Sequence, residues 1–76
     1  MASAYVLINV ELGAEEELLK TVRAIPGVIE AHRVFGIYDT VLKVQAETTS
    51  KLNEVITQRI RRLPRVRSTL TMIIIE

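Results

Sequence analysis

The chain has 76 residues, which is enough for one domain but too few to bury a large core without help. It contains no cysteine, so disulfides and thiolate metal sites are excluded, and small domains of this kind often gain burial from a partner subunit. Basic and acidic residues number 10 and 9, so the chain lacks the basic excess that is typical of nucleic-acid-binding proteins.

The sequence also lacks the features of an exported or membrane-bound protein. Its apolar runs all fall short of the roughly 20 residues that span a bilayer. The stretch after Met1 has neither the basic region nor the cleavage site of a targeting signal. We therefore expect a cytoplasmic protein with no membrane partner.

The first half of the chain predicts a strand, a helix and a second strand. In residues 5–12, every second residue from Val6 to Leu12 is apolar, which indicates a half-buried strand. Residues 14–25 carry three glutamates in the first turn, which suit the positive end of a helix dipole, and then place apolar residues at helical spacing. Residues 28–37 form the next strand, with Gly36 near its end, where a turn needs freedom in φ.

The second half predicts a strand, a longer helix and a last strand. Residues 40–46 follow the previous strand at hairpin spacing. The hydroxyls of residues 48–50 are good helix N-caps, and the helix that follows has an apolar face that ends at Leu63 and Pro64. Residues 66–75 carry apolar side chains to both faces of a strand, which predicts cover on both faces.

This order predicts an α+β fold of the ferredoxin-like βαββαβ type, with a four-stranded antiparallel sheet and two helices on one face. Right-handed crossovers place the first and third strands at the centre of the sheet. The face without helices then carries Leu7, Asn9, Val41 and Lys43, so we expect a dimer through the sheet, which is a dimeric α+β barrel. The last strand is a long apolar edge, and it too needs a partner.

Few residues suit catalysis. His32 is the one histidine, and a single imidazole on a strand is expected to be packed or hydrogen-bonded, so we predict no enzyme, no metal site and no cofactor. The aromatic residues are too few for an RNA-stacking sheet. The basic cluster of Arg59, Arg61, Arg62, Arg65 and Arg67 is interpreted as a solvated helix end, with an anion or nucleic-acid contact as the alternative.

Residues 36–39, GIYD, are either an ordinary hairpin turn or part of a small-molecule site. Free backbone N–H groups in a turn can hold a carboxylate, and Asp39 can hold an ammonium group, so the pair suits an amino acid. Ser68, Thr69 and Thr71 on the last strand offer hydroxyls. Because that strand and the second strand are at opposite edges of the sheet, we expect such a site to form between subunits.

The segments AHRVFGIYDTVLKV, IPGVIEAHRV and LPRVRSTLTMII resemble the ligand-binding (RAM) domain of Lrp/AsnC transcription regulators, and the resemblance covers residues 4–75. It implies the fold given above, dimers that pair through their sheets, larger assemblies that are commonly octamers, and effectors such as amino acids bound between dimers. The effector-binding residues that it implies are Gly36, Ile37, Tyr38, Asp39, Ser68, Thr69 and Thr71.

The sequence departs from the family pattern in two places. The first strand begins within five residues of Met1, so we expect a single RAM domain over residues 1–76, no DNA-binding domain and no direct contact with nucleic acid. Phe35 stands where many members have threonine, which could alter or close the effector pocket.

Three hypotheses follow. The first is a module that binds an amino acid effector, forms oligomers, and modulates transcription of amino acid metabolism by assembly with itself or with full-length Lrp/AsnC regulators. The second is a small dimeric α+β barrel enzyme, of the cofactor-free oxygenase or isomerase type, which uses His32 and Asn9. The third is a structural partner that binds no ligand.

Overall fold

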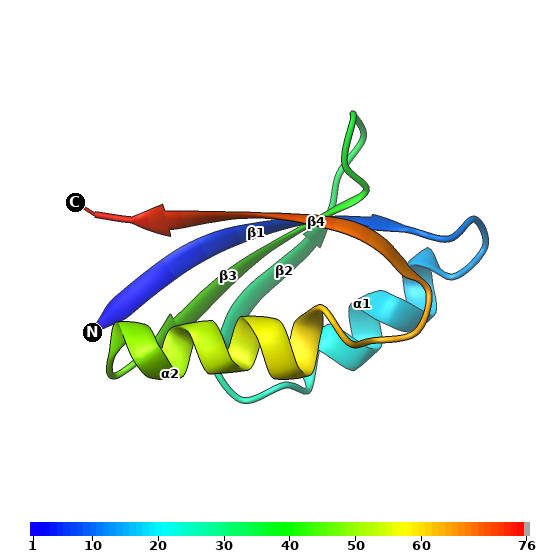
Figure 1. Ribbon diagram of the computed structural model, residues 1–76. Coiled ribbons are helices and arrows are strands. Elements are labelled where there is room, and N and C mark those ends of the chain that lie inside the picture. The colour runs from blue at the N-terminus through cyan, green and yellow to red at the C-terminus, as the bar shows by residue number, and fades with distance from the viewer. Residues whose placement is uncertain (76) are drawn as a thin grey trace.

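A computed structural model describes residues 1–75 as one four-stranded antiparallel sheet with its helices on one face (Figure 1). The strand order is β2-β3-β1-β4, so the predicted ferredoxin-like fold and its central strands are confirmed. In chain order the elements are β1 (Ala2–Val10), α1 (Glu15–Arg23), β2 (Val28–Arg33), β3 (Thr40–Ala46), α2 (Thr49–Glu54), the π-helix η1 (Val55–Ile60) and β4 (Val66–Ile74).

The core lies between the sheet and the helix layer. In β1 and β3, alternate residues point toward the helices and are buried, while their neighbours on the other face stay partly exposed. This alternation follows from the two-residue period of a strand. The side chains that are fully buried and largest are Ile8, Leu42, Leu52, Ile60, Val6, Val22, Val44 and Thr40.

The second helical segment begins as predicted, at a hydroxyl cap. The side chain of Thr48 accepts a hydrogen bond from the N–H of Lys51, with 3.1 Å between the two atoms. Its core residues Leu52, Ile56 and Ile60 are spaced four apart. An α-helix would rotate each of them by about 40° from the last. The wider turns of η1 reduce this drift and keep the three side chains directed at the sheet.

Strand β1 ends earlier than predicted. Its pairing stops at Val10, and the chain then turns, with the N–H of Ala14 donating to the carbonyl of Glu11 over 3.0 Å and Gly13 at φ +90°. Leu12 was predicted to lie on the buried face of this strand, but it is 95% exposed. That prediction is wrong because the alternating register does not continue through a turn.

The loop between β2 and β3 is longer than predicted. Strand β2 ends at Arg33, and residues 34–39 rise from the sheet on the side opposite the helices (Figure 1). The prediction of strand up to residue 37 is wrong. Gly36 does not have a positive φ, and a Cβ built on it would meet nothing within 4 Å, so this chain alone does not require glycine there.

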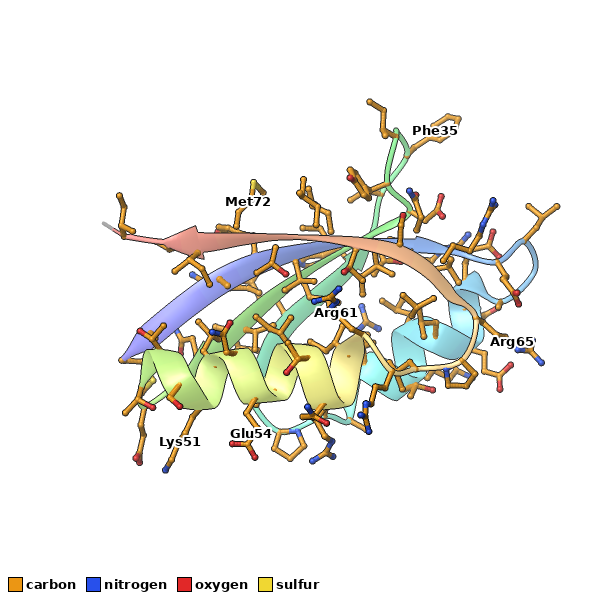
Figure 2. The ribbon with its side chains drawn as sticks, viewed as in Figure 1. Phe35, Lys51, Glu54, Arg61, Arg65 and Met72 are labelled. Atoms are coloured by element: carbon orange, nitrogen blue, oxygen red, sulfur yellow. The ribbon has the colours of Figure 1, made fainter. Side chains whose placement is uncertain are left out.

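Strand β4 is not covered on both faces, which corrects the prediction for residues 66–75. None of its nine residues is buried within the described chain. Ile73 faces the helix layer yet remains 43% exposed, and Met72 on the opposite face is 45% exposed. Figure 2 shows Met72 directed away from the helices. This edge strand therefore projects beyond the cover that the helices provide.

Candidate functional site

Asp39 is fixed at the point where the long loop returns to the sheet. Its N–H donates to the carbonyl of Ile8 over 3.0 Å, and its carbonyl accepts from the N–H of Val34 over 2.9 Å. Its carboxylate oxygen Oδ2 accepts from the N–H of Val10, with 2.9 Å between the atoms. Its other oxygen, Oδ1, makes no hydrogen bond within residues 1–75, so it is available to a ligand.

Asn9 and Ser68 form the polar floor beside Asp39. They are register partners on β1 and β4, and the side-chain amide Nδ2 of Asn9 donates to the hydroxyl of Ser68 over 3.2 Å. The register shifts directly after this pair, at a bulge between Asn9 and Val10. Bulges redirect nearby side chains, and this one leaves Arg67 without a register partner on β1.

These elements surround a pocket with a volume of about 490 Å³. It falls within the range of about 300–1,000 Å³ that is usual for small-molecule sites. Its lining combines one cation, two carboxylates, an amide, a hydroxyl and three apolar side chains. The lining residues are Asn9, Val10, Leu12, Glu15, Ile37, Asp39, Arg67 and Ser68. Such a mixture suits a small ligand that carries both charges and a short apolar part.

The pocket brings together only part of the predicted set. Ile37, Asp39 and Ser68 line it, whereas Gly36 and Tyr38 lie in the same loop without lining it. The three residues with hydroxyl side chains do not share one face of the sheet, because successive residues of a strand point to opposite faces. Ser68 lies on the open face of the sheet, while Thr69 and Thr71 are register partners of the buried residues Ile8 and Val6 and therefore face the helix side.

The pocket also lies within one protomer. We expected the turn and the last strand to meet only across a subunit boundary. Instead, Asp39 lies against the end of β1 on one side, and Ser68 pairs with β1 on the other. Asp39 directly precedes β3, which is the neighbour of β1 in the sheet, so the two predicted halves of the site meet at β1, the strand between β3 and β4.

Three polar lining residues were not predicted as ligand contacts. Arg67 was placed in the basic cluster at a helix end, and Glu15 was assigned to the helix dipole. Asn9 was considered only for the enzyme hypothesis. The bulge that frees Arg67 leaves no sign in the sequence. The two-residue period of the strand did place Asn9 on the open face of the sheet, and this was the one feature of the sequence that pointed to its role in the pocket.

The loop also presents unused backbone donors. The N–H groups of residues 35–38 make no hydrogen bond within the described chain. The side chains of Phe35 and Ile37 at this loop are 107% and 88% exposed, and Phe35 stands at the loop tip (Figure 2). A turn with free N–H groups can bind a carboxylate, as the sequence suggested.

His32 does not line the pocket formed by Asn9, Asp39 and Arg67. Its Nε2 is 3.2 Å from Oε1 of Glu30, and its side chain is 61% exposed, which agrees with the expected hydrogen-bonded histidine. It borders a separate hollow along β2 with Arg23 and Ile29, and it does not share a pocket with Asn9. Within residues 1–75, no three histidine or carboxylate side chains are close enough to hold a metal ion.

The helices found in residues 1–75 are all too short or too polar to cross a membrane.

The fold and the pocket define a small ferredoxin-like α+β domain with a mixed-charge pocket at one end of its sheet. Family comparison agrees with this class. The model of the Lrp/AsnC ligand binding domain matches residues 3–76, and the chain belongs to this family.

Relatives and solved structures give the same assignment. The HTH-type transcriptional regulator PF0250 of Pyrococcus furiosus is 31% identical over 74 residues, which are 93% of this chain and 49% of that protein. The chain therefore spans about half the length of this relative. The crystal structure of FFRP-DM1 is 39% identical, with a TM-score of 0.95 over 99% of this chain and 100% of that one.

A more distant structure shares the fold. The transcriptional regulator NMB0573 of Neisseria meningitidis, solved as a complex with L-Met, is 14% identical and has a TM-score of 0.87 over 99% of this chain and 50% of that one.

Proposed function

We propose that this chain binds an amino acid effector and forms oligomers, and that it modulates transcription of amino acid metabolism by assembly with itself or with full-length Lrp/AsnC regulators. The observation that carries the proposal is the presence of Arg67 and Asp39 on one pocket of a chain in the Lrp/AsnC ligand-binding family. An amino acid presents the two complementary charges, a carboxylate and an ammonium group.

The pocket offers a specific division of roles. The guanidinium of Arg67 suits the carboxylate, because arginine binds carboxylates through paired donors. Oδ1 of Asp39 and the carboxylate of Glu15 suit the ammonium group. Leu12 and Ile37 supply apolar surface for a side chain. The L-Met complex of the Neisseria relative makes apolar amino acids the first ligands to test.

The open sheet face supports oligomerisation. Tyr5, Leu70 and Met72 on this face are 40%, 44% and 45% exposed. An apolar sheet face of this kind is best buried against a second copy, and two-fold symmetry is the commonest arrangement. The loop of residues 34–39 rises on the same side (Figure 1), so its exposed tip would reach the partner and support larger assemblies such as octamers.

A thermal-shift screen against the twenty amino acids tests the effector proposal. Ligand at a hundredfold excess over Kd stabilises the folded state by about 2.7 kcal/mol. For a domain of this size each 1 kcal/mol raises Tm by about 4–8 °C. A ligand that acts should lose its effect when its carboxylate is amidated or its amine is acetylated. If none of the twenty changes Tm or the sedimentation coefficient, the effector proposal is wrong.

A further inference from the structure

The charges that line the pocket do not balance. The lining carries the guanidinium of Arg67 and the carboxylates of Glu15 and Asp39, so one positive charge stands against two negative ones. None of these three side chains makes an ion pair within residues 1–75. A zwitterionic amino acid brings one charge of each sign, so it would leave the excess of one carboxylate unchanged.

The two carboxylates are anchored in the same way. Oε1 of Glu15 accepts from the N–H of Gly13, and Oδ2 of Asp39 accepts from the N–H of Val10, over 2.9 Å in both cases. The two donors lie at the end of β1 and in the turn that follows it. The second oxygen of each carboxylate makes no hydrogen bond within the described chain. The pocket therefore holds two oriented carboxylates, each with one oxygen available to a ligand.

Glu15 differs from the two glutamates that follow it in α1. It is half-buried and lines the pocket, whereas Glu16 and Glu17 are exposed and do not line it. Oε2 of Glu17 is instead 4.0 Å from Nη1 of Arg65. The helix dipole explains why acidic residues are favoured at this end of α1. It does not explain why one of the three contributes to a pocket that already contains Asp39.

The three charges reach the pocket from different elements. Asp39 is bonded to the end of β1 and Arg67 lies in β4, so both belong to the sheet end of the pocket. Glu15 comes from the start of α1, directly after the turn that contributes Leu12. If Arg67 and Asp39 bind the α-carboxylate and the α-ammonium group, Glu15 is the charged residue that remains for the side chain of the ligand.

We propose that Glu15 selects amino acids whose side chain ends in a cation, the chemical class of lysine, ornithine and arginine. This selection rests on the proposed function, because it takes the α groups to bind Arg67 and Asp39 as described above. The side chains of Leu12 and Ile37 suit the apolar stem of such a ligand, which carries its charge only at the end. The terminal cation donates to the free oxygen of Glu15 in a charge-assisted hydrogen bond, and the loaded pocket becomes neutral.

Matched ligands test the selection in the wild-type chain. Lysine and norleucine share the same unbranched carbon side chain, but only lysine ends in an ammonium group. Calorimetric titration should give a Kd for lysine that is lower by about tenfold, which corresponds to about 1.4 kcal/mol. Nε-acetyl-lysine, which lacks the side-chain charge, should bind like norleucine. Equal Kd values for lysine and norleucine would overturn the selection and leave the effector proposal standing. If no amino acid binds, the effector proposal is wrong and the selection falls with it.

Substitutions at the start of α1 test whether Glu15 is responsible. Glu15→Gln keeps an acceptor for the N–H of Gly13 but loses the charge, so the Kd values of lysine and norleucine should become equal. Glu16→Gln removes the same charge from an exposed neighbour outside the pocket, so it should keep the wild-type preference. Circular dichroism confirms that both variants are folded. A Glu15→Gln variant that still prefers lysine, or a Glu16→Gln variant that loses the preference, would overturn the role of Glu15.

Discussion

The carboxylate of Asp39 accepts a hydrogen bond from the backbone N–H of Val10, with 2.9 Å between Oδ2 and the nitrogen. This bond joins the end of the long loop to the end of β1. It satisfies a backbone donor at the point where the strand ladder stops, and it leaves the second oxygen of this pocket-lining residue without a hydrogen bond within residues 1–75. One side chain thus serves both the fold and the proposed binding site.

The two roles of Asp39 can be separated by two substitutions. Asp39→Ala removes the acceptor of the Val10 N–H, so we expect the free energy of unfolding to fall by about 1.5–3 kcal/mol, as for hydrogen bonds to charged groups. Asp39→Asn keeps an acceptor oxygen and should retain most of this stability, but it loses the charge that suits an ammonium group. Urea unfolding and thermal shift measure the two effects. An Asn variant that still responds to amino acids would remove Asp39 from the binding site.

Arg67 provides a test of the carboxylate contact, with a matched control in the same chain. Arg67→Gln should abolish the thermal shift that an amino acid produces, because the pocket then has no cation. Arg62→Gln removes the same charge from an exposed position that does not line the pocket, so its thermal shift should equal that of the wild type. Equal losses in both variants would show that only net charge matters.

The two loop glycines should respond in opposite ways to alanine. Gly27 has φ +100°, and a Cβ on it would lie 3.0 Å from the carbonyl oxygen of Gln45. Gly27→Ala should therefore lower the free energy of unfolding by at least about 1–2 kcal/mol. Gly36→Ala meets neither obstacle, and it should leave stability unchanged or raise it by about 0.4–1 kcal/mol. Chemical unfolding measures both.

If Gly36→Ala keeps the protomer stable but weakens ligand binding or assembly, the glycine is needed for close approach of a ligand or a second copy. If it unfolds the domain, the loop has another conformation from the one described.

The sequence predicted the parts of the fold that depend on burial within the chain. The alternation in β1 and β3 and the helical spacing of Leu18 and Val22 report directly which face is covered. Strand β3 has the bounds that were predicted, residues 40–46. The failures occur where the chain is apolar but not buried. Residues 34–37 resemble a strand in composition, yet within residues 1–75 no strand pairs with them.

The binding pocket was only partly predictable. Asp39 and Ser68 belong to segments that were recognised, but Arg67 enters the pocket through a bulge, and a bulge changes which residue faces which side without any change in composition. Asn9 and Ser68 are 59 positions apart, so only the strand register brings them together. The sequence shows correctly that β4 is apolar. No element within residues 1–75 buries this strand, however, so the predicted cover on both faces is not found there.

Association through the open face of the sheet can be tested with one charge substitution. Met72→Lys places a charge on the open face, next to its register partner Tyr5. We expect a shift to a smaller species in sedimentation, with the free energy of unfolding of the protomer little changed, because Met72 is already 45% exposed. Gln58→Lys adds the same charge at an exposed residue of η1, on the helix side of the sheet and outside the pocket, so it is the control. Identical sedimentation of all three proteins would exclude face pairing.

Thr40 gives a prediction for the core beneath the site. It is fully buried on the helix side of β3, and its hydroxyl Oγ1 has no hydrogen-bond partner among residues 1–75. A buried hydroxyl without a partner lowers stability by about 1–3 kcal/mol. Thr40→Val keeps the shape and removes the hydroxyl, so we expect urea unfolding to report a gain of about 1 kcal/mol or more. Thr40→Ser keeps the hydroxyl and loses the methyl group, so it should destabilise the domain. A loss of stability in Thr40→Val would mean that the hydroxyl is satisfied in solution, and that this end of the sheet, next to Asp39, admits a polar partner.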